Sequence, residues 1–208
     1  MKHRVSRETF PLRWMTDRGL MVASGANTLA LYRRLQAAAL PGIQELVLAD
    51  GSLLLVLEAG AEIPSALTEL LNGQLVEADA ATGRRHEIAL RFDGEDLAEV
   101  SERVGLPRSA LIEWLCSLDL VVKFLGFQPG FAYLDGLPPE LHLPRRANPR
   151  KRVPAGSVAL GGGYCGIYPA AGPGGWHLLG TTAEPMFDPA AEPPARLQPG
   201  DSVRLVAA

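Results

Sequence analysis

The sequence predicts an α+β protein in two domains: a ferredoxin-like βαββαβ domain in residues 1–92, and a helical bridge with a β-barrel in residues 93–208. Residues 1–92 alternate between strand-like apolar runs and helix-like stretches in the βαββαβ order. Residues 126–180 hold about half of the chain's 22 glycines and 17 prolines, which excludes long helices there. The same stretch is rich in aromatic residues, which are scarce in disordered chains. Ordered strands and loops of a barrel fit it best.

The first half of the N-terminal domain predicts a strand, a helix and a hairpin. Residues 19–23 form a short apolar run that is typical of a strand. Asn27 is a suitable cap for a helix whose apolar residues recur at helical spacing up to Ala39, and residues 41–42, Pro-Gly, end that helix. Residues 44–49 and 53–57 predict two strands, joined by an Asp-Gly turn.

The remaining elements follow from caps and short apolar runs. Pro64 begins a predicted helix, and residues 86–92 predict the last strand of the domain. Asp93 is the predicted cap of a bridging helix, and Pro107 begins a second one. Four further runs predict strands of the barrel: residues 121–125, 157–160, 176–179 and 202–206.

Composition bounds the classes of function. A net charge of -3 gives no reason to bind nucleic acid or an anionic membrane. The most apolar segment, residues 46–61, contains charged residues and is too short to span a bilayer. Residues 1–10 lack the apolar core of a secretory signal. Cys116 and Cys165 lie far apart, which favours two free thiols in a reducing cytosol, so we expect a cytoplasmic protein.

Two segments are candidates for binding. In residues 126–134, glycines and a proline alternate with aromatic residues, which predicts either a rigid pocket wall or a tight loop that packs its own rings. Residues 144–154 carry five cations between prolines, including Arg145 and Arg150. Such guanidinium groups can bind a carboxylate or phosphate, although a solvated basic loop is the usual role of a charge run.

No catalytic group or metal site is predicted. Ser157 does not lie in a Gly-x-Ser-x-Gly turn, and Cys165 has no partner that one sequence can assign. The four histidines show no metal-ligand spacing, and we assign His177 to the surface of a strand. The glycine-rich segments do not end in the Gly-Lys-Ser or Gly-Lys-Thr of a P-loop.

The motifs of the C-terminal half resemble those of a known family. The similar segments are residues 124–134, 136–138, 144–145, 149–150, 153–158, 166–169, 173–176, 187–189, 193–194 and 197–201, with weaker similarity in residues 17–22 and 41–43. Together they resemble the allophanate hydrolase subunit 1, or carboxyltransferase C/D-type, domain. This family includes the B subunit of bacterial 5-oxoprolinase and the sporulation kinase inhibitor KipI.

The resemblance implies a fold, partners and a reaction. The barrel is expected to be cyclophilin-like and to pair with a second cyclophilin-like subunit, of the allophanate hydrolase subunit 2 type. A barrel-type third subunit would complete the complex. The implied activity opens 5-oxoproline to glutamate with ATP, which would act at the level of the complex. The chain alone is expected to be inactive.

We place the substrate-binding site in the motif loops. Arg145 and Arg150 are expected to hold a carboxylate or phosphate, and Gly130, Gly174 and Gly175 to let backbone approach the ligand. The other residues of the predicted site are Phe127, Pro129, Phe131, Tyr133, Ser157, Tyr168 and Trp176, most of them as pocket lining.

Several polar positions depart from the family pattern. Relatives carry glutamine and threonine where this chain has Tyr164 and Cys165, serine at Gly172 and arginine at Thr181. They also carry a histidine at Leu115 and Tyr-Gly-Gly at residues 89–91. These changes favour an alternative: a KipI-like regulatory module that binds a histidine kinase or a partner subunit without chemistry. A carboxyltransferase role in urea breakdown is a third option, for which the chain has no biotin-carrier segment.

Overall fold

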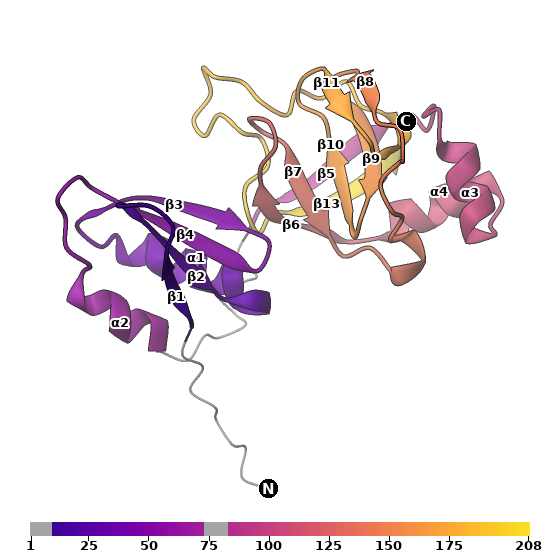
Figure 1. The fold of residues 1–208 in the computed structure, drawn as a ribbon. Coiled ribbons are helices and arrows are strands. Elements are labelled where there is room, and N and C mark those ends of the chain that lie inside the picture. Colours follow the sequence, from indigo (N-terminus) through magenta and orange to yellow (C-terminus); the bar gives the residue numbers. More distant parts are fainter. Residues whose placement is uncertain (1–9, 73–82) are drawn as a thin grey trace, which may run out of the picture. The chain divides into compact units, whose positions relative to one another are not determined.

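The computed structural model describes residues 10–72 and 83–208, which form two compact units (Figure 1). The first unit is Met1–Thr82 and the second is Gly83–Ala208. No helix in the described part of the chain is both long and apolar enough to cross a membrane.

In its described residues, the first unit is an antiparallel sheet with two α-helices. The sheet has four strands in the order β1-β2-β4-β3. Its elements are β1 (Leu12–Trp14), β2 (Gly19–Ala23), α1 (Thr28–Ala38), β3 (Ile43–Ala49), β4 (Ser52–Leu57) and α2 (Ser65–Asn72). Alternate residues of β4 are buried, beginning at Leu53, and Leu31 and Leu67 of the helices are buried as well. This period-2 burial is expected for a sheet with one covered face.

One predicted strand of the N-terminal domain belongs to the other unit. The order β2-α1-β3-β4-α2 follows the prediction, but the strand expected at residues 86–92 is β5 (Arg85–Leu90), which pairs in parallel with β13 (Ser202–Ala207) of the second unit. The boundary between the units therefore falls between Thr82 and Gly83, not after residue 92. The apolar alternation of β5 suits either sheet, so the sequence pattern could not choose between them.

The second unit is built on a sheet that nearly closes into a barrel. Its seven strands have the order β12-β9-β10-β7-β6-β13-β5. Besides β5 and β13, they are β6 (Leu120–Leu125), β7 (Ala132–Asp135), β9 (Ser157–Gly161), β10 (Tyr164–Ile167) and β12 (His177–Thr181). Arg91, just after β5, exchanges two backbone hydrogen bonds of 2.9 Å with Thr181 at the end of β12. This bridge joins the two outer strands of the sheet.

Helices and a second small sheet cover the barrel. The helices α3 (Leu97–Val104) and α4 (Arg108–Ser117) lie together beside it (Figure 1). The strands β8 (Arg150–Val153) and β11 (Gly172–Gly174) pair with each other. Both were missed by the sequence analysis, since β8 is highly charged and β11 is Gly-Pro-Gly, and neither composition is typical of a strand.

Alternate residues of the barrel strands enter two different clusters. Val158, Leu160 and Leu179 belong to the large core that also contains residues of α3 and α4. Ala159 and Leu178, which alternate with them, belong to a smaller cluster with Phe131, Val153, Tyr168 and Trp176. Because successive side chains of a strand point to opposite faces, the smaller cluster lies on the other face of the sheet.

Candidate functional site

Phe131 is the centre of an aromatic cluster formed by the motif loops. Its ring packs edge to face against Phe127, Tyr133, Tyr168 and Trp176, at centroid distances of 5.4, 5.1, 5.2 and 5.5 Å. Phe131, Tyr168 and Trp176 are buried, whereas Phe127 is 58% exposed. The structure thus brings these predicted pocket residues together, and most of them pack against one another as core.

The glycines of these loops give the rings room. A Cβ at Gly174 would overlap the Tyr168 hydroxyl, and one at Gly130 would lie 2.7 Å from Cβ of Phe187. Gly130 also has a φ of 80°, which disfavours any other residue. Both positions therefore require glycine for packing or backbone reasons alone. Gly175 is placed differently, since its carbonyl accepts a hydrogen bond of 2.7 Å from the Arg146 amide.

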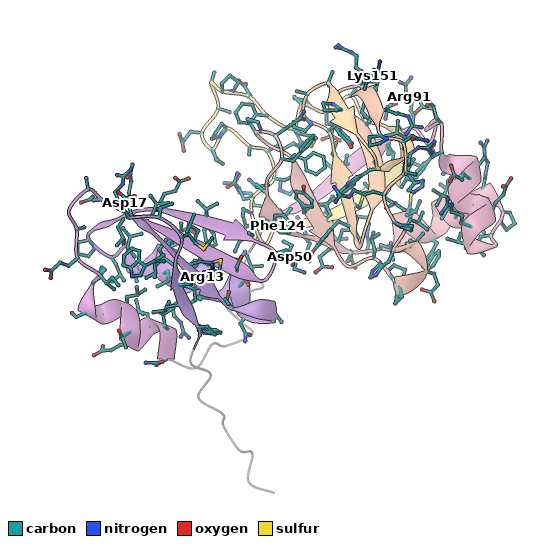
Figure 2. All side chains as sticks on the ribbon, viewed as in Figure 1. Arg13, Asp17, Asp50, Arg91, Phe124 and Lys151 are labelled. Carbon is teal, nitrogen blue, oxygen red and sulfur yellow. The ribbon has the colours of Figure 1, made fainter. Side chains whose placement is uncertain are left out.

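The outer face of β6 and β7 continues the aromatic surface. Phe124 is labelled in Figure 2, and its ring stacks on that of Tyr133 at a centroid distance of 4.2 Å. Burial raises the pKa of both Tyr133 and Tyr168, so both phenols stay protonated at neutral pH.

Two other residues of the predicted site lie in different surroundings. Ser157 is buried, and its carbonyl accepts a hydrogen bond from the Tyr168 amide at 2.9 Å. Pro129 is exposed at the tip of its loop.

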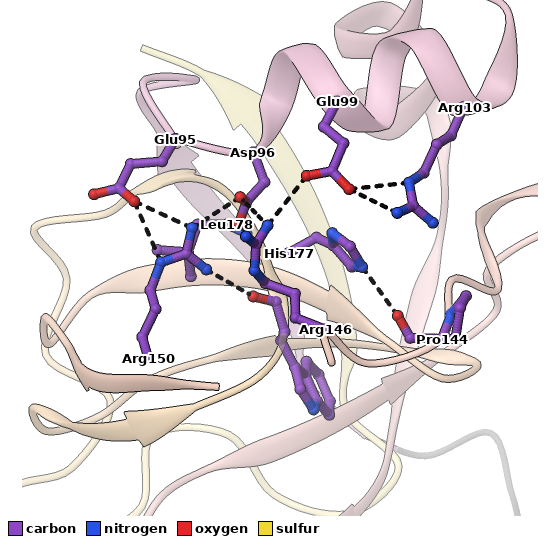
Figure 3. A network of polar contacts seen from close by, with 10 residues as sticks. Glu95, Asp96, Glu99, Arg103, Pro144, Arg146, Arg150, His177 and Leu178 are labelled. Atoms are coloured by element: carbon purple, nitrogen blue, oxygen red, sulfur yellow. Dashed lines mark hydrogen bonds and ion pairs between the residues drawn. The ribbon is translucent and has the colours of Figure 1, made fainter. Parts of the chain in front are cut away.

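Asp96 binds two arginines of the basic segment, residues 144–154 (Figure 3). Its Oδ1 accepts hydrogen bonds from Nη1 of Arg146 at 2.6 Å and Nη2 of Arg150 at 2.8 Å, and its Oδ2 accepts from the Leu178 amide at 2.7 Å. Asp96 is only 4% exposed. The carboxylate thereby ties the start of α3 to the basic segment and to β12. The predicted helix cap, Asp93, instead accepts a hydrogen bond from the Thr181 hydroxyl.

Two further carboxylates extend this network. Glu95 accepts from Arg150, and Glu99 accepts from Arg103 at 2.7 Å and from Arg146 at 3.1 Å. Arg150, predicted to hold a carboxylate or phosphate of a ligand, is therefore already bound by two carboxylates of its own chain. Hydrogen bonding to Asp96 is the main cause that raises the pKa of Arg150.

The pKa of Asp96 reflects a competition between burial and its partners. Burial is the largest single effect and raises this pKa. The hydrogen bonds from Arg150 and the Leu178 amide and the charges of Arg150 and Arg146 together outweigh it, so the pKa lies below its usual 3.8. Asp96 is therefore ionised at neutral pH. The pKa of Glu99 is lowered too, chiefly by the hydrogen bond from Arg103.

An open cleft lies beside this network. It measures ≈ 370 Å³ and is lined by Glu99, Arg103, Pro144, Arg145, Arg146, Ala147, Asn148 and His177. Arg145 is the one member of the predicted site in this lining. It is exposed, and no carboxylate in the described ranges forms an ion pair with it. A carboxylate or phosphate group in the cleft could reach it without displacing a residue of the chain.

Sequence reasoning missed Asp96, Arg146 and His177. His177, assigned to a strand surface, is only 1% exposed, and its Nε2 lies 3.0 Å from the Pro144 carbonyl oxygen. It begins β12, but the loop at Pro144 covers it. The order of polar residues along the chain gives no signal for contacts between segments so far apart.

In the described residues, no group of histidine, cysteine and acidic side chains could hold a metal ion.

Cys165 is expected to be chemically inert. It is fully buried, and burial raises the pKa of its thiol to about 12, so the thiolate is almost absent at neutral pH. Cys116 is only partly buried. Iodoacetamide should alkylate Cys116 first and Cys165 only after unfolding, as followed by mass spectrometry. Alkylation of both at equal rates in the folded protein would contradict this arrangement.

A family comparison agrees with these motifs. The sequence model of the carboxyltransferase domain, subdomain C and D, matches residues 6–197. The chain belongs to this family. The resemblance inferred from the motif segments is thereby confirmed.

Proteins named as the B subunit of 5-oxoprolinase are similar to this chain in sequence. The B subunit of 5-oxoprolinase from Escherichia coli O157:H7 is 56% identical over 113 residues, which cover 54% of this chain and 52% of the relative. The corresponding protein of Haemophilus influenzae is 44% identical over 127 residues, or 60% of each chain. These matches span only about half to three fifths of the relatives' length.

Solved structures support the fold. TTHA0988 has a TM-score of 0.80 at 40% identity, over 92% of this chain and 40% of that one. The conserved uncharacterised protein PH0987 from Pyrococcus horikoshii has a TM-score of 0.58 at 30% identity, over 95% of this chain and 97% of that one. The urea amidolyase of Kluyveromyces lactis, at 19% identity and a TM-score of 0.66 over 96% of this chain and 15% of that one, shows the shared fold alone.

Proposed function

We propose that this chain is a subunit of an ATP-dependent amidohydrolase complex that opens 5-oxoproline to glutamate. The observation that carries the proposal is the 56% identity to the B subunit of a 5-oxoprolinase. A protein named as one subunit of an enzyme works beside others, so the chain is proposed to act in a complex. The open cleft at Arg145 suits this role, because 5-oxoproline carries a carboxylate.

The partners are proposed to be a second cyclophilin-like subunit and a barrel-type subunit, in the cytoplasm. ATP is proposed to be used by the complex. Within this chain, the thiol of Cys165 is too buried to serve as a nucleophile. We propose that the partner subunits contribute to the chemistry and that this chain binds and orients substrate.

Reconstitution tests the proposal directly. The chain is co-expressed with the neighbouring subunits, and glutamate release from 5-oxoproline is measured with and without ATP. We expect ATP-dependent release from the complete set and none when this chain is omitted. Unchanged turnover without this chain would contradict the proposal.

A regulatory role is the second candidate. It is favoured by positions that depart from the family pattern and that make internal contacts here. Thr181 donates to Asp93, Tyr164 accepts from Lys123 at 3.1 Å, and Cys165 lies in the core. Affinity purification distinguishes the two roles: a cyclophilin-like partner should be recovered if the chain belongs to the enzyme, and a histidine kinase if it is a KipI-like inhibitor.

A further inference from the structure

The sheet of the first unit has two faces that differ in burial. The helix α1 packs against β3 and β4 and also contacts α2, which places both helices on one face. Leu53 and Leu55 of β4 point to that face and are fully buried. Leu54 and Val56 alternate with them, so they point to the opposite face, where they are only partly buried. Neither α-helix described in this unit covers the opposite face.

The strand register brings four apolar side chains together on this uncovered face. Leu54 pairs with Met21 of β2 and with Val47 of β3, and Val56 lies two residues further along β4. Directly paired residues of antiparallel strands point to the same face, so these four residues form one apolar stripe across three strands. Val47 is 39% exposed, and the other three are partly buried. A contiguous apolar surface of this kind is typical of a protein contact.

One charge of each sign stands at either edge of the apolar stripe. Arg13 of β1 pairs with Met21, and Glu45 of β3 pairs with Val56, so both charged side chains belong to the uncovered face. The strands β1 and β3 are the two outer strands of this sheet. Both residues are exposed, and in the ranges 10–72 and 83–208 neither forms an ion pair within the chain. The face therefore has a positive edge, an apolar centre and a negative edge.

We propose that a second copy of this chain packs on the uncovered face, sheet against sheet. Sheets packed face to face keep their strands nearly aligned. A twofold axis that runs between the sheets and along the strands places β1 of each copy over β3 of the other. This arrangement brings Arg13 of one copy close to Glu45 of the other, twice, and stacks Met21 on Leu54.

The charges select this axis over the other one that sheet packing allows. A twofold axis across the strands would place β1 over β1 and β3 over β3. Arg13 would then meet Arg13, and Glu45 would meet Glu45, and like charges at an interface oppose association. The apolar stripe alone suits either axis, so the two charged edges decide the orientation.

Sedimentation equilibrium of the full chain tests the dimer. The mass should rise from that of one chain to that of two as the protein concentration is raised to the millimolar range. Methyl signals of Met21, Leu54 and Val56 should shift in nuclear magnetic resonance spectra over the same concentrations. A mass of one chain throughout would overturn the proposal, whatever else covers this face. A dimer that leaves these methyl signals unmoved would overturn it as well.

An exchange of charges tests the orientation. Arg13→Glu and Glu45→Arg should each weaken the dimer by about tenfold, because the twofold axis turns two attractive contacts into two repulsive ones. The double variant restores opposite charges and should dimerise as the unchanged chain does. Both effects should diminish at high salt, which screens exposed charges. A double variant that dimerises no better than the single ones would refute the axis along the strands.

A matched pair of apolar positions tests the location. Val47→Lys places a charge in the apolar stripe and should weaken the dimer by at least about tenfold. Val206 of β13 is also 39% exposed but belongs to the second unit, so Val206→Lys should leave the dimer unchanged. Circular dichroism verifies that each variant is folded. Equal losses in the two variants, or a loss in Val206→Lys alone, would place the contact elsewhere and overturn the proposal.

The dimer and the proposed function are tested separately. The mass is measured on this chain without ATP, 5-oxoproline or partner subunits. A chain that dimerises through this face but supports no glutamate release would refute the enzyme role and leave the dimer standing. A chain that stays monomeric but supports glutamate release in the reconstituted complex would refute the dimer and leave the enzyme role standing.

Discussion

Replacement of Asp96 by asparagine is expected to lower the free energy of unfolding by about 3 kcal/mol, the size expected when one partner of a buried ion pair is removed. Asp96 is 4% exposed and accepts hydrogen bonds from Arg146, Arg150 and the Leu178 amide. An amide can still accept the Leu178 hydrogen bond, but it leaves two guanidinium groups without their shared counter-charge. Urea denaturation followed by circular dichroism measures the loss.

The pH dependence of the same variant gives a second measurement. Because the pKa of Asp96 in the folded state lies below 3.8, its ionisation stabilises the fold fully above about pH 4, and this stabilisation is lost as the pH falls through the lower folded value. The unchanged protein should therefore lose more stability than Asp96→Asn on acidification below about pH 4.

Glu95 provides the matched control. It binds the same arginine, Arg150, but its side chain is 75% exposed. Glu95→Gln is expected to change stability by less than about 1 kcal/mol, since exposed ion pairs contribute little. If Asp96→Asn and Glu95→Gln behaved alike, Asp96 would not be the central residue of this network.

Replacement of Phe131 by alanine is expected to cost about 3–5 kcal/mol of unfolding free energy. The ring is 1% exposed and packs against four other aromatic rings. A Cβ at Gly166 would lie 2.7 Å from its Cζ, so the neighbouring backbone fits closely against the ring. Neighbours this rigid cannot collapse into the cavity that alanine would leave. Thermal and urea denaturation measure the effect.

Phe127 is the control within the same loop. It contacts Phe131 and Tyr168 by their edges but is 58% exposed, and its φ is 65°. Phe127→Ala removes little buried surface and should change stability by less than about 1 kcal/mol. If Phe127→Ala lowered the free energy of unfolding as much as Phe131→Ala, Phe131 would not be the centre of the aromatic cluster.

Local signals in the sequence identified most elements correctly. Short apolar runs located β2, β4 and β13, and proline and glycine residues marked the end of α1 and the start of α4. The strand β10 was missed because its sequence, Tyr-Cys-Gly-Ile, lies among glycines that suggest a loop. The partner of β5 was missed because its pairing with β13 joins segments at opposite ends of the second unit.

The candidate site was predicted unevenly. The aromatic residues and Arg145 were chosen as candidates because their types point to packing and to anion binding. Asp96 was passed over for Asp93, since capping preference selects an acidic residue near a helix start without revealing what it binds. Its partners, Arg146 and Arg150, lie in the basic segment of residues 144–154. The sequence does not show which of these cations pairs with which carboxylate.

The sequence by itself determined the family, the α+β class and the segments that carry the motifs, because these depend on residue types and on spacing within short stretches. Only the tertiary structure decided that β5 joins the second sheet, that Arg150 is neutralised by Asp96, and that Arg145 is left facing a cleft. Strand pairing and ion pairing join residues far apart in the chain, and neither leaves a periodic trace in the sequence.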